Sequence, residues 1–124
     1  MGINVMIIDD SSVMRKIVER SLRQACKDSI DEVHEAGDGG EAIEKLKDAS
    51  VNIIFSDINM PNVNGIEFLK KLKESPQGGL PVIMVTTEGG EKMLLEAMQL
   101  GAKGVIRKPF TPVQMEAALS KALA

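Results

Sequence analysis

The sequence predicts an α/β fold in which a doubly wound parallel sheet of five strands has helices on both faces. Short apolar runs of strand length alternate with amphipathic stretches of helical length. Three of the runs are almost unbroken Val, Ile and Met, as expected for strands buried on both faces of a sheet. The third run leads to a carboxylate, Asp57, where the chain leaves the sheet, and open α/β sheets bind ligands at that edge.

Length and composition favour one domain over residues 1–124. A chain of 124 residues buries roughly two-thirds of its unfolded surface, so it needs no disulfide or structural metal to fold. Cys26 is the only cysteine, and we expect a packed core thiol in an intracellular protein. The net charge is −3 with Lys and Arg scattered, which argues against nucleic acid as a direct partner.

Neither a membrane span nor a secretory signal is indicated by the hydropathy pattern. Every apolar run is shorter than the roughly 18 residues of a span. The first 20 residues carry Asp9, Asp10, Arg15 and Lys16, where a signal peptide would be apolar. We therefore expect a cytoplasmic protein with no membrane partner.

The strands can be placed from the apolar runs and the loops between them. They are expected at Ile3–Ile8, Glu32–Glu35, Val51–Phe55, Val82–Val85 and Lys103–Ile106. The second is short and polar, so it belongs at an edge, where its one histidine, His34, should be solvated. Right-handed crossovers then leave few topologies, of which the simplest is the flavodoxin-like strand order 2-1-3-4-5.

The helices carry their own start signals. Capping side chains stand three residues before an acidic or amide partner in the pairs Asp38 and Glu41, Asn64 and Glu67, and Thr111 and Gln114. Ser11 or Ser12 opens the first helix, whose predicted inward stripe is Val13, Met14, Ile17, Val18, Ser21 and Leu22. The other helices should bury Ile43 and Leu46; Ile66, Leu69 and Leu72; and Met115, Ala118, Leu119 and Ala122.

Polar side chains should meet where four of these strands end. The residues that the strands deliver to this rim are Asp9, Asp10, Asp57, Thr86, Thr87 and Lys108. Each of them alone is commonplace as a turn, cap or surface residue. Their coincidence at the same end of four successive strands instead indicates a functional site.

Three carboxylates in one cleft require a cation. Two of them about 5 Å apart repel by roughly 3 kcal/mol at an effective dielectric constant of about 20. Hard oxygen ligands with positions left for water suit Mg²⁺. A carboxylate such as Asp57 can be phosphorylated to an acyl phosphate. The metal and Lys108 would offset its charge, and Thr86 could donate a hydrogen bond to a phosphoryl oxygen.

The same residues make the chain resemble the receiver domains of two-component response regulators. The motifs are Val5–Asp10, Asp57–Gly65, Val85–Thr86 and Lys108–Phe110, and the resemblance runs from Ile3 to Leu123. Through Ser11–Arg15, Thr86–Gly90 and Lys108–Thr111 the chain is most similar to the CheY-like single-domain chemotaxis regulators.

The resemblance implies that Asp57 accepts a phosphoryl group from the phosphohistidine of a sensor histidine kinase. It implies that Asp10, Asp57 and the backbone carbonyl of Asn59 hold Mg²⁺, with Asp9 acting through water. Thr86 and Lys108 would contact the phosphoryl oxygens.

The resemblance also assigns roles around this centre. Asn59 and Glu88 match positions that tune hydrolysis of the acyl phosphate, and the bond from Lys108 to Pro109 would be cis. One position departs from the family pattern, because many relatives carry Tyr or Phe where this chain has Val105. Valine is short and stiff in χ1. We therefore expect signal transfer through the loop and helix after Thr86.

A partner surface is expected on the helix at about 88–100. Its apolar residues cover about 220° of a helical wheel, more than one buried face of roughly 100° needs. Some of them, with Leu94 foremost, should point outward. Together with residues 103–107 and 112–123 they would form the face that binds a downstream protein, with the chain a monomer.

The sequence leaves other functions open. A phosphatase of the aspartyl-phosphate type needs a second acid where Asn59 stands, and a flavodoxin-like cofactor binder would not place Asp9 and Asp10 at a phosphate site. A degenerate receiver would lack the complete acid, threonine and lysine set. The chain could also be cut from a larger regulator, or serve a phosphorelay unrelated to chemotaxis. The leading interpretation is a phospho-switch that catalyses only its own phosphorylation and dephosphorylation.

Overall fold

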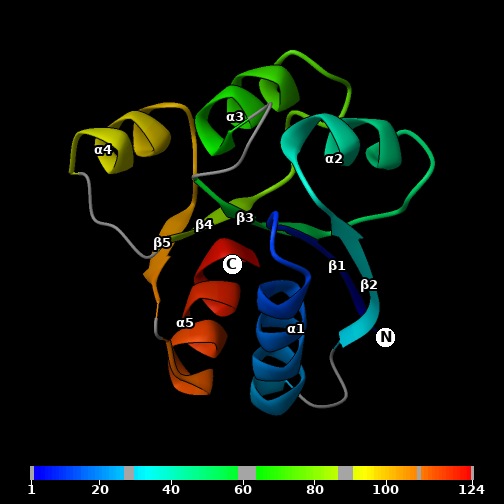
Figure 1. The fold of residues 1–124 in the computed structure, drawn as a ribbon, viewed down its shortest axis with the longest axis vertical. Helices are drawn as coiled ribbons and strands as arrows, with labels where there is room; N and C mark the ends of the chain where they lie inside the picture. The colour runs from blue at the N-terminus through cyan, green and yellow to red at the C-terminus, as the bar shows by residue number, and fades with distance from the viewer. Residues whose placement is uncertain (1, 27–29, 59–63, 87–90, 109, 124) are drawn as a thin grey trace.

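The computed structural model describes residues 2–26, 30–58, 64–86, 91–108 and 110–123. The elements in chain order are β1 (Ile3–Ile8), α1 (Ser12–Cys26), β2 (Ile30–Ala36), α2 (Gly39–Leu46), β3 (Ile53–Asp57), α3 (Gly65–Lys73), β4 (Val82–Thr86), α4 (Glu91–Gln99), β5 (Gly104–Arg107) and α5 (Pro112–Leu123). The strands pair in parallel in the order β2-β1-β3-β4-β5, which confirms the predicted topology. Figure 1 shows α1 and α5 on one face of the sheet and α2, α3 and α4 on the other.

The strand bounds lie within two residues of those predicted. β1 has the predicted ends, and β2 is an edge strand with exposed polar residues, as expected. β3 begins at Ile53, two residues after the predicted start. The preceding Asn52 bonds to Asn4 of β1: its amide donates to the Asn4 carbonyl at 2.8 Å, and its side chain accepts the Asn4 amide at 2.8 Å. β3 also ends two residues later than predicted, so Asp57 is the last residue of the strand.

Alternate residues of the central strands enter two separate cores, as the pleat of a β-strand requires. On β1, Val5 and Ile7 pack with residues of α1 and α5, whereas Met6 and Ile8 pack with residues of α2 and α3. All four side chains are at most 1% exposed. The apolar runs read from the sequence are thus strands buried on both faces.

The predicted helix caps are present. Asn64 accepts the amide of Glu67 at 2.9 Å, and the Glu67 carboxylate accepts the amide of Asn64, which completes a capping box at the start of α3. Thr111 and Gln114 make the same reciprocal pair at the start of α5, at 3.2 and 2.9 Å. Asp38 caps α2 through its side chain. Each of these caps contributes about 1 kcal/mol.

The predicted inward stripe of α1 is wrong at two positions. Val18 and Leu22 are buried and Met14 is half-buried, but Val13 is 69% exposed and Ile17 is 43% exposed. The buried stripe of α1 is a narrow row of residues four positions apart, Met14, Val18 and Leu22. At 100° per residue Ile17 lies about 100° and Val13 about 140° from Val18 at the centre of this row, so both face away from it, in keeping with their exposure. Elsewhere the helix residues predicted to be inward are buried, except that Ile43 and Ala118 are only partly buried against the cores.

The outward residues of α4 also differ from the prediction. Leu94 is half-buried against the core, whereas Leu95 is 63% exposed and Met98 is 46% exposed. Ala97 on the same helix is fully buried. Since Leu94 is three positions before Ala97, it shares the inward side of the helix, and Leu95 is turned away from it.

Two further side chains were singled out in the sequence. Cys26 is partly buried against the core under α1 and α5, as predicted, and burial raises the pKa of its thiol. His34 is half-buried, so a solvated histidine was wrong: its Nε2 atom is buried, with no hydrogen-bond partner among the described residues. No helix in the described part of the chain is both long and apolar enough to cross a membrane.

Candidate functional site

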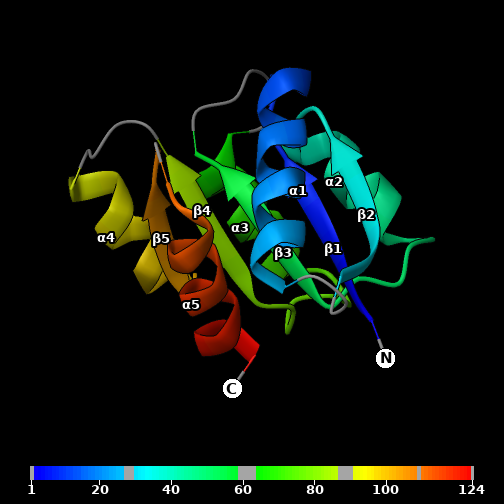
Figure 2. The same ribbon diagram turned by 90° about the horizontal axis from the view of Figure 1, so that it is seen from below.

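The parallel sheet brings the predicted site residues to one edge. Asp9 and Asp10 follow β1, Asp57 ends β3, Thr86 ends β4, and Lys108 follows β5. Figure 2 shows the arrowheads of these four strands at the same edge of the sheet. The carboxyl ends of parallel strands are where open α/β sheets bind ligands.

Three carboxylates converge at this edge. One oxygen from each of Asp9, Asp10 and Asp57 lies within 4.8 Å of the other two. Asp9 is buried, Asp57 is half-buried and Asp10 is exposed. Three carboxylate oxygens this close fit a hard divalent cation that keeps several of its waters, because the attraction of the cation offsets their mutual repulsion. The described residues thus include an acidic cluster that could hold a metal ion.

Lys108 provides the positive charge within this cluster. Its Nζ atom lies 3.0 Å from Oδ2 of Asp9 and 3.8 Å from Oδ2 of Asp57, and its side chain is only 9% exposed. Its backbone amide donates to the carbonyl of Thr86 at 2.8 Å, which ties the end of β5 to the end of β4. One ammonium balances only one of three carboxylates, so the cluster keeps an affinity for cations.

Backbone hydrogen bonds orient two of the carboxylates. The amide of Ile58 donates to Oδ1 of Asp57 at 2.8 Å, and the hydroxyl of the buried Ser56 donates to the Asp57 carbonyl at 2.9 Å. The amide of Ser11 donates to Oδ1 of Asp9 at 2.9 Å. These bonds leave each acid with an oxygen directed at Lys108, so the two carboxylates face a common centre.

The remaining predicted site residues divide into two groups. Thr86 is fully buried at the end of β4, opposite Arg107 in the sheet register. Asn59, Thr87, Glu88 and Pro109 lie outside the described residues, so their predicted roles stay predictions.

Sequence analysis missed one contact that supports the acidic cluster. The Arg15 guanidinium donates to the backbone carbonyl of Asp9 at 2.6 Å and to the Glu35 carboxylate at 2.9 Å. The opposite charges of Arg15 and Glu35 were a signal for their ion pair, whereas nothing in the sequence indicates the bond to the Asp9 carbonyl. Only the pairing of β1 with β2 in the sheet shows that the start of α1 lies beside the end of β2.

Gly65 allows α3 to begin against the backbone of Asp57. A Cβ atom at this position would lie 2.5 Å from the Asp57 carbonyl oxygen and 2.7 Å from Cα of Ile58. The Gly65 amide donates to the Ile58 carbonyl at 2.8 Å, which fixes this close approach. The glycine of the sequence motif is thus required by packing directly behind the site.

We expect Gly65→Ala to lower the free energy of unfolding by about 2 kcal/mol, because a methyl group forced into a close-packed site costs roughly this amount. Urea denaturation measures the change. Gly79→Ala is the matched control, since nothing lies within 4 Å of a Cβ at that position. It should shift stability by less than about 0.5 kcal/mol. Equal effects of the two substitutions would contradict the close approach at Gly65.

Comparison with known proteins identifies the class to which this fold and site belong. The family of response regulator receiver domains matches residues 5–120. The chain therefore belongs to the response regulator receiver domain family, the signalling domain of two-component systems.

Individual relatives narrow the class further. A chemotaxis protein CheY homolog of Campylobacter jejuni is 39% identical over 121 residues, covering 96% of this chain and 91% of that protein. The structure of the chemotaxis protein CheY4 of Vibrio cholerae is 35% identical, covers 99% of this chain and 100% of its own, and superposes with a TM-score of 0.87. A putative response regulator from Chloroflexus aurantiacus has a TM-score of 0.88 at 24% identity over 99% of this chain and 98% of its own, which bears on the fold alone. The chain is thus a CheY-like, chemotaxis-type response regulator.

Proposed function

We propose that the protein is a single-domain phospho-switch, over residues 1–124, in which Asp57 accepts a phosphoryl group from the phosphohistidine of a sensor histidine kinase. A carboxylate oxygen of Asp57 forms a bond to phosphorus as the bond from phosphorus to the donor nitrogen breaks. The observation that supports this most directly is the convergence of three carboxylates within 4.8 Å, with Lys108 between two of them. The protein acts in the cytoplasm as a monomer, and it catalyses only its own phosphorylation and dephosphorylation.

The roles of the site residues in this proposal follow from their charge and position. Asp9, Asp10 and Asp57 hold Mg²⁺, with the backbone of Asn59 as a further ligand. When bound, the metal ion neutralises charge on the acids and on the phosphoryl oxygens. Lys108 lies within reach of the Asp57 oxygen, so its ammonium stabilises negative charge that reaches that place. Thr86 contributes its hydroxyl from the end of β4.

Incubation of the protein with acetyl phosphate and Mg²⁺ tests the proposal. Intact mass spectrometry should show a gain of about 80 Da, one phosphoryl group. The gain should disappear when EDTA replaces Mg²⁺, because three carboxylates and an incoming phosphate repel one another without a divalent cation. An unmodified mass with Mg²⁺ present, or an equal gain with EDTA, would refute a metal-dependent phosphoryl acceptor.

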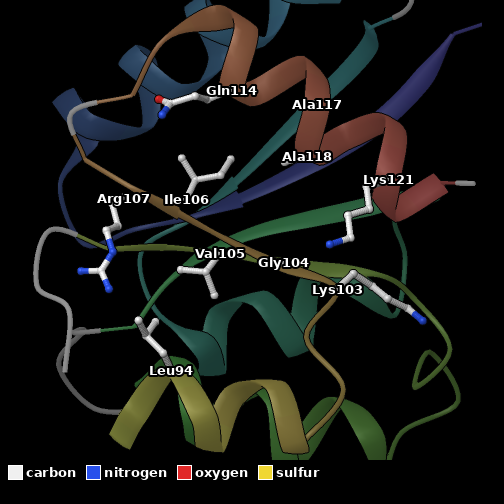
Figure 3. Close-up of a pocket in the computed structure, with 10 residues that line it drawn as sticks. All are labelled: Leu94, Lys103, Gly104, Val105, Ile106, Arg107, Gln114, Ala117, Ala118 and Lys121. Atoms are coloured by element: carbon white, nitrogen blue, oxygen red, sulfur yellow. The ribbon is translucent and has the colours of Figure 1, made fainter. Parts of the chain in front are cut away.

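The downstream partner is proposed to bind in a groove between α4, β5 and α5. Figure 3 shows Leu94 of α4 and Val105 of β5 pointing toward one another across its floor, with residues of α5 along the far side. The lining includes the small residues Gly104, Ala117 and Ala118 and the bases Lys103, Arg107 and Lys121, and none of the described residues that line it is an acid. An apolar segment with acidic neighbours matches this groove in shape and charge.

Phosphorylation should alter this groove through the segment after Thr86. Val105 lines the groove where an aromatic ring stands in many relatives, and its short, stiff side chain cannot swing between an outward and an inward pose as a ring does. Adding Mg²⁺ and a phosphoryl mimic should therefore shift the backbone amide resonances of α4 and β5 as well as those at the site. Shifts confined to residues that touch the three carboxylates would count against a coupled surface.

A further inference from the structure

Arg15 joins three separate parts of the fold. It lies in the first turn of α1, and its Nη1 atom donates to the carbonyl oxygen of Asp9, at the end of β1, at 2.6 Å. Its Nε atom donates to Oε1 of Glu35, near the end of β2, at 2.9 Å. The two side chains are largely covered, with 18% of Arg15 and 27% of Glu35 exposed. The planar guanidinium allows both bonds at once, which a lysine ammonium on a flexible stem does less well.

The carbonyl that Arg15 binds belongs to the peptide unit between Asp9 and Asp10. Because the six atoms of the unit are coplanar, a bond that holds this oxygen restrains rotation of the whole peptide about the line between its two Cα atoms. The Asp9 carboxylate is also held by the Ser11 amide and by Lys108. Asp10 is exposed, so the direction of its carboxylate depends on the backbone that carries it. The bond from Arg15 to this peptide therefore acts on the direction of Asp10 through the backbone.

Glu35 keeps the arginine in place. Its second oxygen accepts a hydrogen bond from Lys16 at 2.8 Å, so one carboxylate receives two basic side chains of α1. The hydrogen bond from Lys16 holds the pKa of Glu35 below its usual value, and the bond from Arg15 acts in the same direction, although burial opposes them. Glu35 is therefore ionised at neutral pH, and both of its hydrogen bonds are assisted by charge.

We propose that Arg15 is a positioning residue for the metal site, which holds the peptide between Asp9 and Asp10 so that three carboxylates converge on one cation. This inference rests on the proposed function, because it assumes that the cluster binds a divalent ion. The direction in which Mg²⁺ affinity changes when Arg15 is removed distinguishes a positioning role from a purely electrostatic one. As a nearby positive charge alone, Arg15 would weaken cation binding, and its removal would tighten it. As a positioning residue, its removal weakens binding.

Calorimetric titration with Mg²⁺ of the wild type and of Arg15→Met tests the proposal. We expect Arg15→Met to raise the dissociation constant about tenfold or more, as loss of a group that orients a metal ligand usually does. Arg15→Lys keeps the charge but loses the planar fork, so it should weaken binding in the same direction. Lys16→Met is the matched control. It removes the other basic side chain that binds Glu35, and Lys16 makes no hydrogen bond to Asp9. The dissociation constant for Mg²⁺ should therefore change by no more than about twofold.

Urea denaturation without Mg²⁺ shows whether each variant is folded. If Arg15→Met is unfolded, Mg²⁺ binding by Arg15→Lys tests the role of Arg15 instead. Unchanged or tighter Mg²⁺ binding by the folded Arg15 variants, with the wild type binding normally, would overturn the role of Arg15 alone. A wild type that binds no Mg²⁺ would overturn the proposed function, and the inference with it. The two failures are therefore distinguishable.

Discussion

Asp57→Asn should abolish phosphorylation by acetyl phosphate, reducing the rate of mass gain at least 100-fold, roughly the size of effects seen when a nucleophile is removed. The amide oxygen of asparagine can still accept the Ile58 amide, which Asp57 accepts at 2.8 Å, so the fold of the loop is retained. The amide nitrogen cannot form an acyl phosphate. Intact mass spectrometry after incubation with acetyl phosphate and Mg²⁺ measures the effect.

The matched control for this variant is Asp48→Asn, which makes the same chemical change at an exposed turn after α2. It should be phosphorylated at the wild-type rate. Asp57→Asn should also be no less stable than the wild type without Mg²⁺, since it removes one of three mutually repelling carboxylates. A phosphorylated Asp57→Asn protein would show that another residue is the acceptor.

Lys108→Met should have the second largest effect, with opposite consequences for metal binding and for phosphorylation. The Lys108 ammonium lies 3.0 Å from Asp9 and 3.8 Å from Asp57, so it competes electrostatically with a divalent cation. Removing a unit charge at such a distance should tighten Mg²⁺ binding about tenfold, or about 1.4 kcal/mol. Phosphorylation should become slower, because no ammonium remains to stabilise the phosphoryl oxygens.

Mg²⁺ titration and the rate of mass gain on the same sample separate the two effects. Lys103→Met is the control, because Lys103 is exposed and precedes β5, whereas Lys108 follows it at the site edge. It should change neither quantity by more than about twofold, because exposed charges at a distance are screened by salt. Weaker Mg²⁺ binding by Lys108→Met would mean that the lysine organises the carboxylates rather than opposing the cation.

The fold was predictable because its signals are local. Runs of Val, Ile and Met in the sequence indicate buried strands. The capping residues Asn64 and Thr111 each precede their partner by three residues. Strand ends in a parallel sheet share an edge, so the convergence of Asp9, Asp57 and Lys108 followed from topology alone.

The errors arise where the outcome depends on which elements become neighbours. A helical wheel places Val13 and Ile17 beside other apolar residues of the first helix, but it cannot show that this flank of α1 stays exposed among the described residues. The same limit applied to Leu94, which turns toward β5 while Leu95 turns to solvent. A side chain that binds a backbone carbonyl leaves no pattern in the sequence, and this is why the contact of Arg15 with Asp9 was found only in the structure.

Locating the phosphoryl group on the Mg²⁺-loaded protein tests the central claim most directly. Reduction of the acyl phosphate with borohydride, followed by proteolysis and tandem mass spectrometry, marks the carboxylate that carried it. The account predicts one modified residue, Asp57, and no modification in samples prepared with EDTA. A mark on Asp9 or Asp10 instead, or the same mark at Asp57 with the metal removed, would contradict it.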